Sequence, residues 1–108
     1  MYIYNVTTNV EDSIHEEWLQ WIQNEYIPEV LSTGKFYKAL VSRVQIEEEM
    51  GGTTYSIQYT TNSKESLEEF QQKFGEKISQ SNTRFAGKTV SFATELDVVS
   101  ELYQPEVS

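Results

Sequence analysis

The chain has 108 residues, enough for one domain with a two-layer core, and hydrophobic residues make up 38% of it. Its formal net charge is −9, and its eight Lys and Arg residues are scattered, so nucleic acid and membrane surfaces are not expected partners. The absence of cysteine excludes disulfides and thiolate zinc sites, and no basic leader or apolar run of membrane-spanning length is visible, so we expect a cytoplasmic protein.

The first third of the chain predicts a strand followed by a long helix. Residues 2–9 are rich in β-forming side chains that alternate between two faces. Ser13 and Glu16 have capping-box spacing, which predicts the helix start. An apolar stripe follows at helical spacing: Ile14, Trp18, Trp21, Ile22, Tyr26, Ile27, Val30 and Leu31. Pro28 lacks an amide hydrogen, so we expect a kink or break there, then a short helix that Gly34 ends.

The rest of the chain predicts two strands, a helix and a last strand. Strands are expected at residues 36–46 and 53–60, with a tight turn at Gly51-Gly52. Asn62 or Ser63 would cap the second helix. Its apolar stripe is Leu67, Phe70, Phe74 and Ile78. Residues 89–96 form the last strand, so we expect one domain over residues 1–100 and a C-terminal tail over residues 101–108.

The element order β-α-β-β-α-β predicts a ferredoxin-like α+β fold, a four-stranded antiparallel sheet with both helices on one face. The side chains expected to face the helices are Tyr2, Tyr4, Val6, Tyr55, Ile57, Tyr59, Val90 and Phe92. Those expected on the opposite face are Asn5, Thr7, Thr54, Ser56, Gln58, Ser91 and Ala93. This second face is polar but nearly uncharged, which favours a homodimer that closes a barrel over it, contacting through Asn5, Thr7, Ser56 and Gln58. An open sheet rich in Thr and Ser is the alternative.

Three blocks of the sequence carry a resemblance: "YIYNVTTNV", "HEEWLQWIQNEYIPEVLSTGKF" and "GGTTYSIQYT". Together they resemble a family of short bacterial proteins defined only as a domain of unknown function, over about residues 1–100. That family is grouped by fold with the dimeric α/β barrels, which include antibiotic-biosynthesis-monooxygenase-like proteins. The resemblance therefore implies a dimeric α/β barrel and supplies no reaction or catalytic position.

His15 is the one weak candidate for catalysis. It is the only histidine of the chain and the only side chain whose ordinary pKa lies near neutrality. It could act as a general base in a helix–sheet cavity, or simply lie exposed in the first helical turn. "HEEWL" begins like the metalloprotease signature, but Leu19 replaces the second histidine, so no metal site is expected.

Aromatic side chains mark a candidate pocket between the first helix and the sheet. We expect it to be lined by His15, Trp18, Ile22, Tyr4, Tyr55 and Tyr59. The alternative is that the tryptophans belong to the core, while buried tyrosine hydroxyls need a water, a ligand or each other as partners. A small apolar or aromatic ligand is the expected occupant, and no cofactor is predicted.

Three functions are therefore open. The first is a non-catalytic small-ligand-binding or regulatory module, favoured by the many tyrosines and the few catalytic residue types. The second is a cofactor-independent monooxygenase or isomerase acting on a small aromatic compound, suggested by the fold resemblance and His15. The third is a dimerisation module without a ligand, for which a fully packed interior is expected.

Overall fold

The computed structural model describes residues 1–46 and 51–105, with the side chains of residues 77–83 left aside. Its strands are β1 (Tyr2–Val10), β2 (Lys38–Arg43), β3 (Thr53–Thr61) and β4 (Thr89–Asp97). Its α-helices are α1 (His15–Trp21), α2 (Ile27–Ser32) and α3 (Lys64–Ser81). Shorter helical turns are Asp12–Ile14, Ile22–Tyr26 and Asn82–Phe85. The element order confirms the predicted β-α-β-β-α-β pattern.

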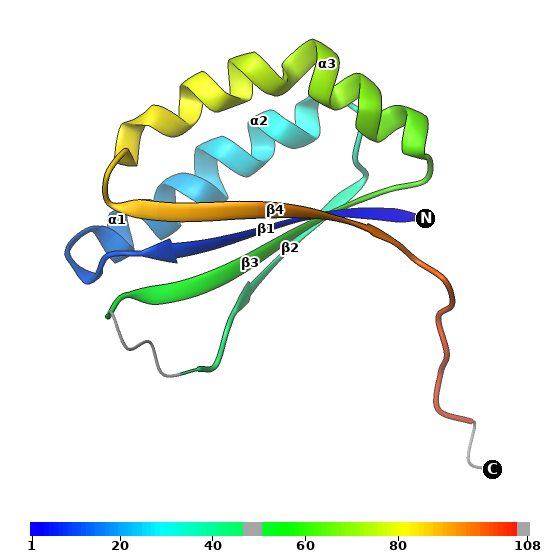
Figure 1. The fold of residues 1–108 in the computed structure, drawn as a ribbon, viewed down its shortest axis with the longest axis horizontal. Helices are drawn as coiled ribbons and strands as arrows, with labels where there is room; N and C mark the ends of the chain where they lie inside the picture. The colour runs from blue at the N-terminus through cyan, green and yellow to red at the C-terminus, as the bar shows by residue number, and fades with distance from the viewer. Residues whose placement is uncertain (47–50, 106–108) are drawn as a thin grey trace.

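The strands form one antiparallel sheet in the order β2-β3-β1-β4. The α1–α2 segment and α3 lie side by side over the same face of this sheet, and the opposite face is bare (Figure 1). This is the predicted ferredoxin-like arrangement. After β4 the chain runs away from the sheet toward the C-terminus (Figure 1), and no helix in the described part of the chain is long and apolar enough to cross a membrane.

The core lies between the two layers. Its buried side chains are Val10, Trp18, Trp21, Ile22, Ile27, Val30, Phe36, Tyr55, Ile57, Tyr59, Leu67, Phe70 and Phe85. Both predicted helix stripes contribute to it, although the side chain of Ile78 lies outside the described set. The alternating side chains of β3 supply the floor, because every second residue of a strand points to the same face.

The last strand has the opposite phase from the one expected. Val6 pairs with Ala93 and Thr8 with Ser91, and directly paired residues share a face, so Ser91 and Ala93 lie on the helix side. Val90 and Phe92 point away from the helices and are 73% and 62% exposed. The prediction that these two face the helices, and that Ser91 and Ala93 lie opposite, is therefore wrong.

The start of the first helix also differs from the prediction. The Ser13 hydroxyl donates a hydrogen bond to the Glu11 carboxylate (3.4 Å) and caps no helical amide. A short 3₁₀ turn precedes α1, so the predicted capping box is not formed. In α3, by contrast, the Ser66 amide donates to the Ser63 hydroxyl (3.1 Å), which confirms a cap at the second helix.

Pro28 is accommodated without breaking the helix. Ile27 keeps helical angles (φ −62°, ψ −44°), contrary to the expectation that Pro28 would push it out of them. A π-helical turn over Ile22–Tyr26 comes immediately before α2, and Pro28 lies in the first turn of α2, as predicted. The φ of Gly34 is +76°, and Gly34 follows α2 at the predicted end of the helix.

Candidate functional site

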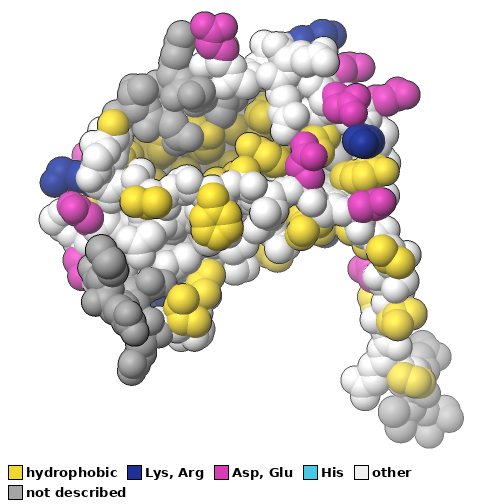
Figure 2. Space-filling model, in the orientation of Figure 1, with side chains coloured by type: hydrophobic (Ala, Val, Ile, Leu, Met, Phe, Trp, Pro, Cys, Tyr) yellow, Lys and Arg dark blue, Asp and Glu magenta, His cyan; other side chains and the backbone are white. Residues whose placement is uncertain are grey.

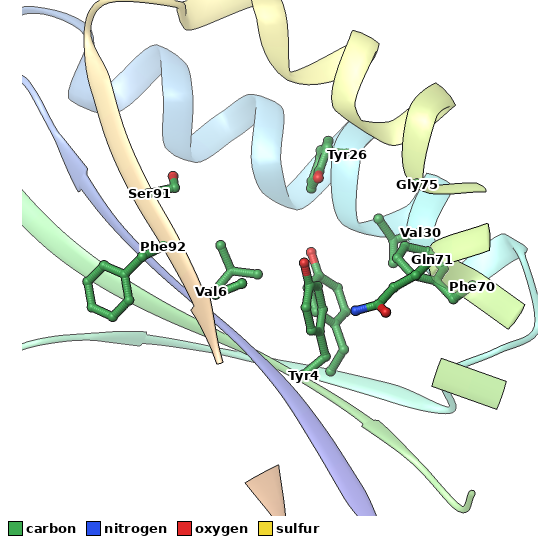
Figure 3. A pocket seen from close by; sticks show the side chains of 11 residues that line it. Tyr4, Val6, Tyr26, Val30, Phe70, Gln71, Gly75, Ser91 and Phe92 are labelled. Atoms are coloured by element: carbon green, nitrogen blue, oxygen red, sulfur yellow. The ribbon is translucent and has the colours of Figure 1, made fainter. Parts of the chain in front are cut away.

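A cavity of about 300 Å³ lies between the helices and the sheet (Figure 3). Its lining residues are Tyr4, Val6, Tyr26, Val30, Tyr59, Phe70, Gln71, Gly75, Ser91, Phe92 and Ala93. An adjoining cavity of about 200 Å³ shares Val6, Tyr26, Tyr59 and Ser91 with it. The remaining residues of this second cavity are Thr8, Trp18, Ile22, Ile57 and Thr89. We refer to the two together as the tyrosine cavity.

The phase of β4 creates this space. Where β3 sends Ile57 and Tyr59 toward the helices, the middle of β4 sends Ser91 and Ala93, which are too small to reach α3. Figure 3 shows Phe92 pointing away from the interior while Ser91 lies beside the cavity. Figure 2 shows the result on the surface, a hollow with hydrophobic side chains in it between the helix layer and β4.

The π-helical turn aligns one row of side chains along the cavity. Residues Trp18, Ile22, Tyr26 and Val30 are spaced by four and all line it. In a regular α-helix a spacing of four drifts by about 40° per step, so such a row would soon turn away from the sheet. The wider turn over Ile22–Tyr26 reduces this drift and keeps Tyr26 over the cavity.

Tyr59 holds the most unusual polar group of the cavity. Its side chain is 2% exposed, and its hydroxyl has no hydrogen-bond partner among the described residues. The ring itself is fixed, with its centroid 5.4 Å from that of Phe36 and 6.2 Å from that of Tyr4. Burial, with smaller contributions from Tyr26 and Tyr4, raises the pKa of Tyr59 far above its ordinary value. The hydroxyl therefore stays protonated and is a donor without an acceptor among the described residues.

Among the described residues, the lining of the tyrosine cavity carries no charged side chain. The pKa of Tyr4 is also raised, first by burial and then by the nearby Glu95 carboxylate, so this hydroxyl is neutral as well. Thr8 and Ser91 share a hydrogen bond between their hydroxyls (2.8 Å). Because an unpaired charge is costly to bury, the cavity suits a neutral molecule.

The predicted pocket residues divide into two groups. Tyr4, Trp18, Ile22 and Tyr59 line the tyrosine cavity, whereas His15 and Tyr55 are absent from its lining. The rings of His15 and Trp18 pack against the ring of Tyr55 between the first helix and the sheet. Their centroids lie 5.5 and 5.2 Å from that of Tyr55. That the first group binds a ligand stays a prediction.

His15 instead belongs to a polar cluster near the hairpin end of the sheet. Its Nε2 atom is hydrogen-bonded to the hydroxyl of Tyr55, which also accepts a hydrogen bond from Arg43 (3.2 Å). The guanidinium of Arg43 lies 5.7 Å from the centroid of the Tyr55 ring. His15 is half-buried and held in place, so its first-turn position is neither freely exposed nor open to the cavity. A catalytic role of His15 stays untested.

Sequence reasoning missed several lining residues. Tyr26 belonged to the predicted helix stripe but was not assigned to the pocket, and the i+4 row from Trp18 was the signal that could have found it. Ser91 and Ala93 were assigned to the opposite face. Gly75 and Gln71 carry no pattern that marks them, since only the approach of α3 to β4 brings them to the cavity. Among the described residues, no cluster of side chains could hold a metal ion.

The outer face of the sheet, away from the helices, combines polar and apolar side chains. Asn5, Thr7, Ser56 and Gln58 all lie on it, as predicted, and the Ser56 hydroxyl donates to the Asn5 side-chain oxygen (2.7 Å). Its exposed apolar residues are Leu40, Val90, Phe92 and Leu96. We call this surface, formed by these polar and apolar residues, the outer face.

Solved structures with the same fold support the architecture. An EthD-family protein of Bacillus halodurans superposes with a TM-score of 0.68 at 15% identity, covering 92% of this chain and 100% of the other. A dimeric ferredoxin-like protein from an uncultured marine organism superposes with a TM-score of 0.66 at 17% identity, covering 96% of this chain and 100% of the other. SnoaB, a cofactor-independent oxygenase from Streptomyces nogalater, superposes with a TM-score of 0.65 at 10% identity, covering 95% of this chain and 98% of the other. At these identities the likeness shows the fold alone.

No curated protein matches the chain. A family match covers residues 1–99, which is nearly the whole chain and agrees with the extent of the resemblance seen in the sequence. The chain therefore belongs to the family described as Domain of unknown function (DUF4286).

Proposed function

We propose that this protein is a non-catalytic binding or regulatory module for a small, neutral, largely aromatic molecule that carries an oxygen acceptor. The observation that carries the proposal is the buried Tyr59 hydroxyl, a proton donor that has no partner among the described residues and belongs to a side chain that lines the tyrosine cavity. A buried donor without an acceptor costs about 1–3 kcal/mol, and a ligand carbonyl or ether would remove that cost.

The rest of the cavity supports the same class of ligand. Aromatic rings line much of it, and flat ligands stack favourably on such rings. The described side chains of its lining offer hydroxyls and an amide but no charge, so an acid or an amine would lose its hydration without gaining a partner among them. The main volume of about 300 Å³ lies at the small end of the range for ligand sites, which suits a molecule of two fused rings.

The test uses 6-propionyl-2-dimethylaminonaphthalene, a neutral fluorescent ketone, as the probe. We expect saturable binding to the wild type and about fivefold weaker binding to Tyr59→Phe, because one neutral hydrogen bond contributes about 1 kcal/mol. Tyr37→Phe is the matched control, since Tyr37 is 51% exposed and lies outside the cavity lining. The measurement is a fluorescence titration with each variant.

A matched ligand pair tests the preference for neutral molecules. We expect 2-acetylnaphthalene to displace the probe and 2-naphthoate, its anionic counterpart, to displace it at least tenfold less well. Absence of saturable binding by the wild type would refute the proposed function. An equal loss of probe affinity in the Tyr59→Phe and Tyr37→Phe variants would refute the role of the Tyr59 hydroxyl.

An enzyme of the cofactor-independent oxygenase type is the alternative outcome. The fold is shared with such an oxygenase, but His15, the predicted base, contacts Tyr55 and is absent from the cavity lining. Consumption of oxygen or conversion of a bound aromatic compound, lost in a Tyr59→Phe variant, would replace the non-catalytic proposal with the enzymatic one. A cytoplasmic location remains part of the proposal.

We further propose that the protein is a homodimer joined through the outer face. In the single chain this face leaves Phe92 and Val90 largely exposed beside neutral polar groups such as Gln58, a composition that suits a covered surface. If a second copy covers the outer face, the large side chains of β4 that point away from the helices of their own chain become buried in the dimer. Two-fold pairing would bring the same patch from both copies together.

Sedimentation velocity tests the assembly. We expect twice the 12.5 kDa chain mass for the wild type at micromolar concentration, and the single-chain mass for Phe92→Lys. Ala86→Lys, which adds the same charge at an exposed position outside the strands, should stay dimeric. A wild type that sediments as a single chain, or a Phe92→Lys variant that remains a dimer, would contradict this interface.

A further inference from the structure

Gly75 stands in the interior of α3 without a packing reason. Glycine destabilises a helix interior relative to alanine, and it is normally tolerated where another element approaches too closely for a side chain. Here nothing in the described structure lies within 4 Å of the place that a Cβ atom would occupy, and the backbone has no positive φ. An alanine would fit, so the glycine serves neither close packing nor an unusual backbone.

Gly75 does line the tyrosine cavity. Figure 3 shows it on α3 at one side of the space, with Ser91 on β4 at the other. Ala93, the other inward residue at this part of β4, is equally small. Among the described residues that line this stretch of the gap, Gly75, Ser91 and Ala93 therefore have a short side chain or none.

One helical turn earlier the gap between α3 and β4 is bridged. The side-chain amide of Gln71 donates a hydrogen bond to the Glu95 carboxylate (3.0 Å), linking the helix to the strand. Gln71 and Gly75 are separated by four residues and so lie on the same side of the helix. The bridge marks one limit of the opening, and Gly75, one turn further along the helix, adds no side chain to the adjacent stretch.

We propose that Gly75 forms the entrance of the tyrosine cavity and determines which molecules can pass into it. The inference rests on the proposed function for its ligand, a neutral aromatic ketone or ether that passes between Gly75 and Ala93 to reach the Tyr59 hydroxyl. That hydroxyl is the independent sign of a ligand, because it is a buried donor with no partner among the described residues. A longer side chain at position 75 would narrow the passage without touching the donor.

The first experiment measures the rate at which 6-propionyl-2-dimethylaminonaphthalene enters, by stopped-flow fluorescence. We expect Gly75→Leu to lower the association rate constant at least tenfold, and Gly75→Ala to lower it less. Gln72→Leu is the matched control, an exposed position of the same helix outside the cavity lining, and should keep the wild-type rate. Gly75→Ala should also raise Tm by roughly 2–6 °C, because alanine is the better helix former.

The second experiment needs no ligand. Acrylamide, a small neutral molecule, is used to quench the fluorescence of Trp18, which lines the adjoining part of the tyrosine cavity. The measurement uses a Trp21→Phe background, in which Trp18 is the only tryptophan. We expect Gly75→Leu to reduce the quenching rate constant at least twofold and Gln72→Leu to leave it unchanged. If Gly75→Leu changed neither the quenching rate constant nor the rate of probe entry, the proposal that Gly75 forms the entrance would be refuted. If Gly75→Leu reduced quenching but the wild type did not bind the probe, the entrance at Gly75 would be supported and the proposed ligand would be refuted.

Discussion

β3 and β4 have the same alternation of large and small side chains, but in opposite phase with respect to the helices. β3 sends Ile57 and Tyr59 inward and keeps Ser56 and Gln58 on the outer face. The middle of β4 sends Ser91 and Ala93 inward, and β4 exposes its large apolar residues on the outer face. The difference places a packed core over β3 and the tyrosine cavity beside β4.

The comparison shows that the last strand serves two surfaces at once. Its small inward residues leave room between α3 and the sheet, and its large outward residues make the outer face apolar at one edge. Because side chains alternate strictly along a strand, neither property can be shifted by one residue without losing the other. Space inside and apolar surface outside are thus two results of one register.

The largest difference is expected between truncations of the main apolar residue of β3 and of β4. Ile57→Ala removes a side chain that is 2% exposed and should lower the free energy of unfolding by about 2–5 kcal/mol. Phe92→Ala removes one that is 62% exposed in the single chain and should change it by less than about 0.5 kcal/mol where the protein is monomeric. Urea unfolding at low protein concentration measures both. A comparable loss in the two variants would show that Phe92 is buried within its own chain.

A smaller effect is expected where β1 joins β4. The Thr8 hydroxyl is buried and hydrogen-bonded to Ser91, so Thr8→Val should lower the free energy of unfolding by about 1 kcal/mol. Thr7→Val is the matched control on the outer face, where the lost hydroxyl is only half-buried. Thermal unfolding of the two variants side by side checks this. A Thr8→Val variant as stable as the wild type would mean that the hydroxyl pair contributes nothing.

The smallest effect should have the opposite sign. Tyr59→Phe removes a buried donor that has no partner among the described residues, so in the absence of ligand it should raise the free energy of unfolding, by up to about 1 kcal/mol. The same substitution should weaken probe binding, so stability and affinity would change in opposite directions. Unfolding of the ligand-free variant is the measurement, and a clear loss of stability would indicate that the Tyr59 hydroxyl is already satisfied.

Much of the fold followed from local patterns. The alternation of Tyr55, Ile57 and Tyr59 and the Ser63 cap each predicted an element that the structure contains. β2 ends at Arg43 and β3 begins at Thr53, so the connection is longer than the tight turn predicted at Gly51-Gly52. The β4 phase could not be read in the same way. Apolar side chains were assumed to face the helices, whereas strand pairing, such as Val6 with Ala93, decides the face, and a single sequence does not display that pairing.

The candidate site was predicted in part, for a similar reason. Trp18 and Ile22 line the cavity because they belong to a helix stripe, and Tyr4 and Tyr59 line it because they are paired neighbours on one face, while their binding of a ligand stays a prediction. The prediction places His15 in the pocket because of its chemistry and because it shares a helix stripe with Ile22 and Tyr26. Its actual partner, Tyr55, lies 40 positions away in the sequence and was expected to line the same pocket. The long-range contact that decides its role leaves no local signature.

The π-helical turn before Pro28 has a consequence for how the chain can vary in length. A turn of this kind holds about one residue more than an α-helical turn, so Ile22–Tyr26 acts like an insertion that the helix has absorbed. Removing one residue from this segment would restore a regular helix and rotate everything beyond it by about 100° relative to α1. Val30 would then leave the sheet while Trp18 stayed. Here the number of residues, as much as their identity, is under constraint.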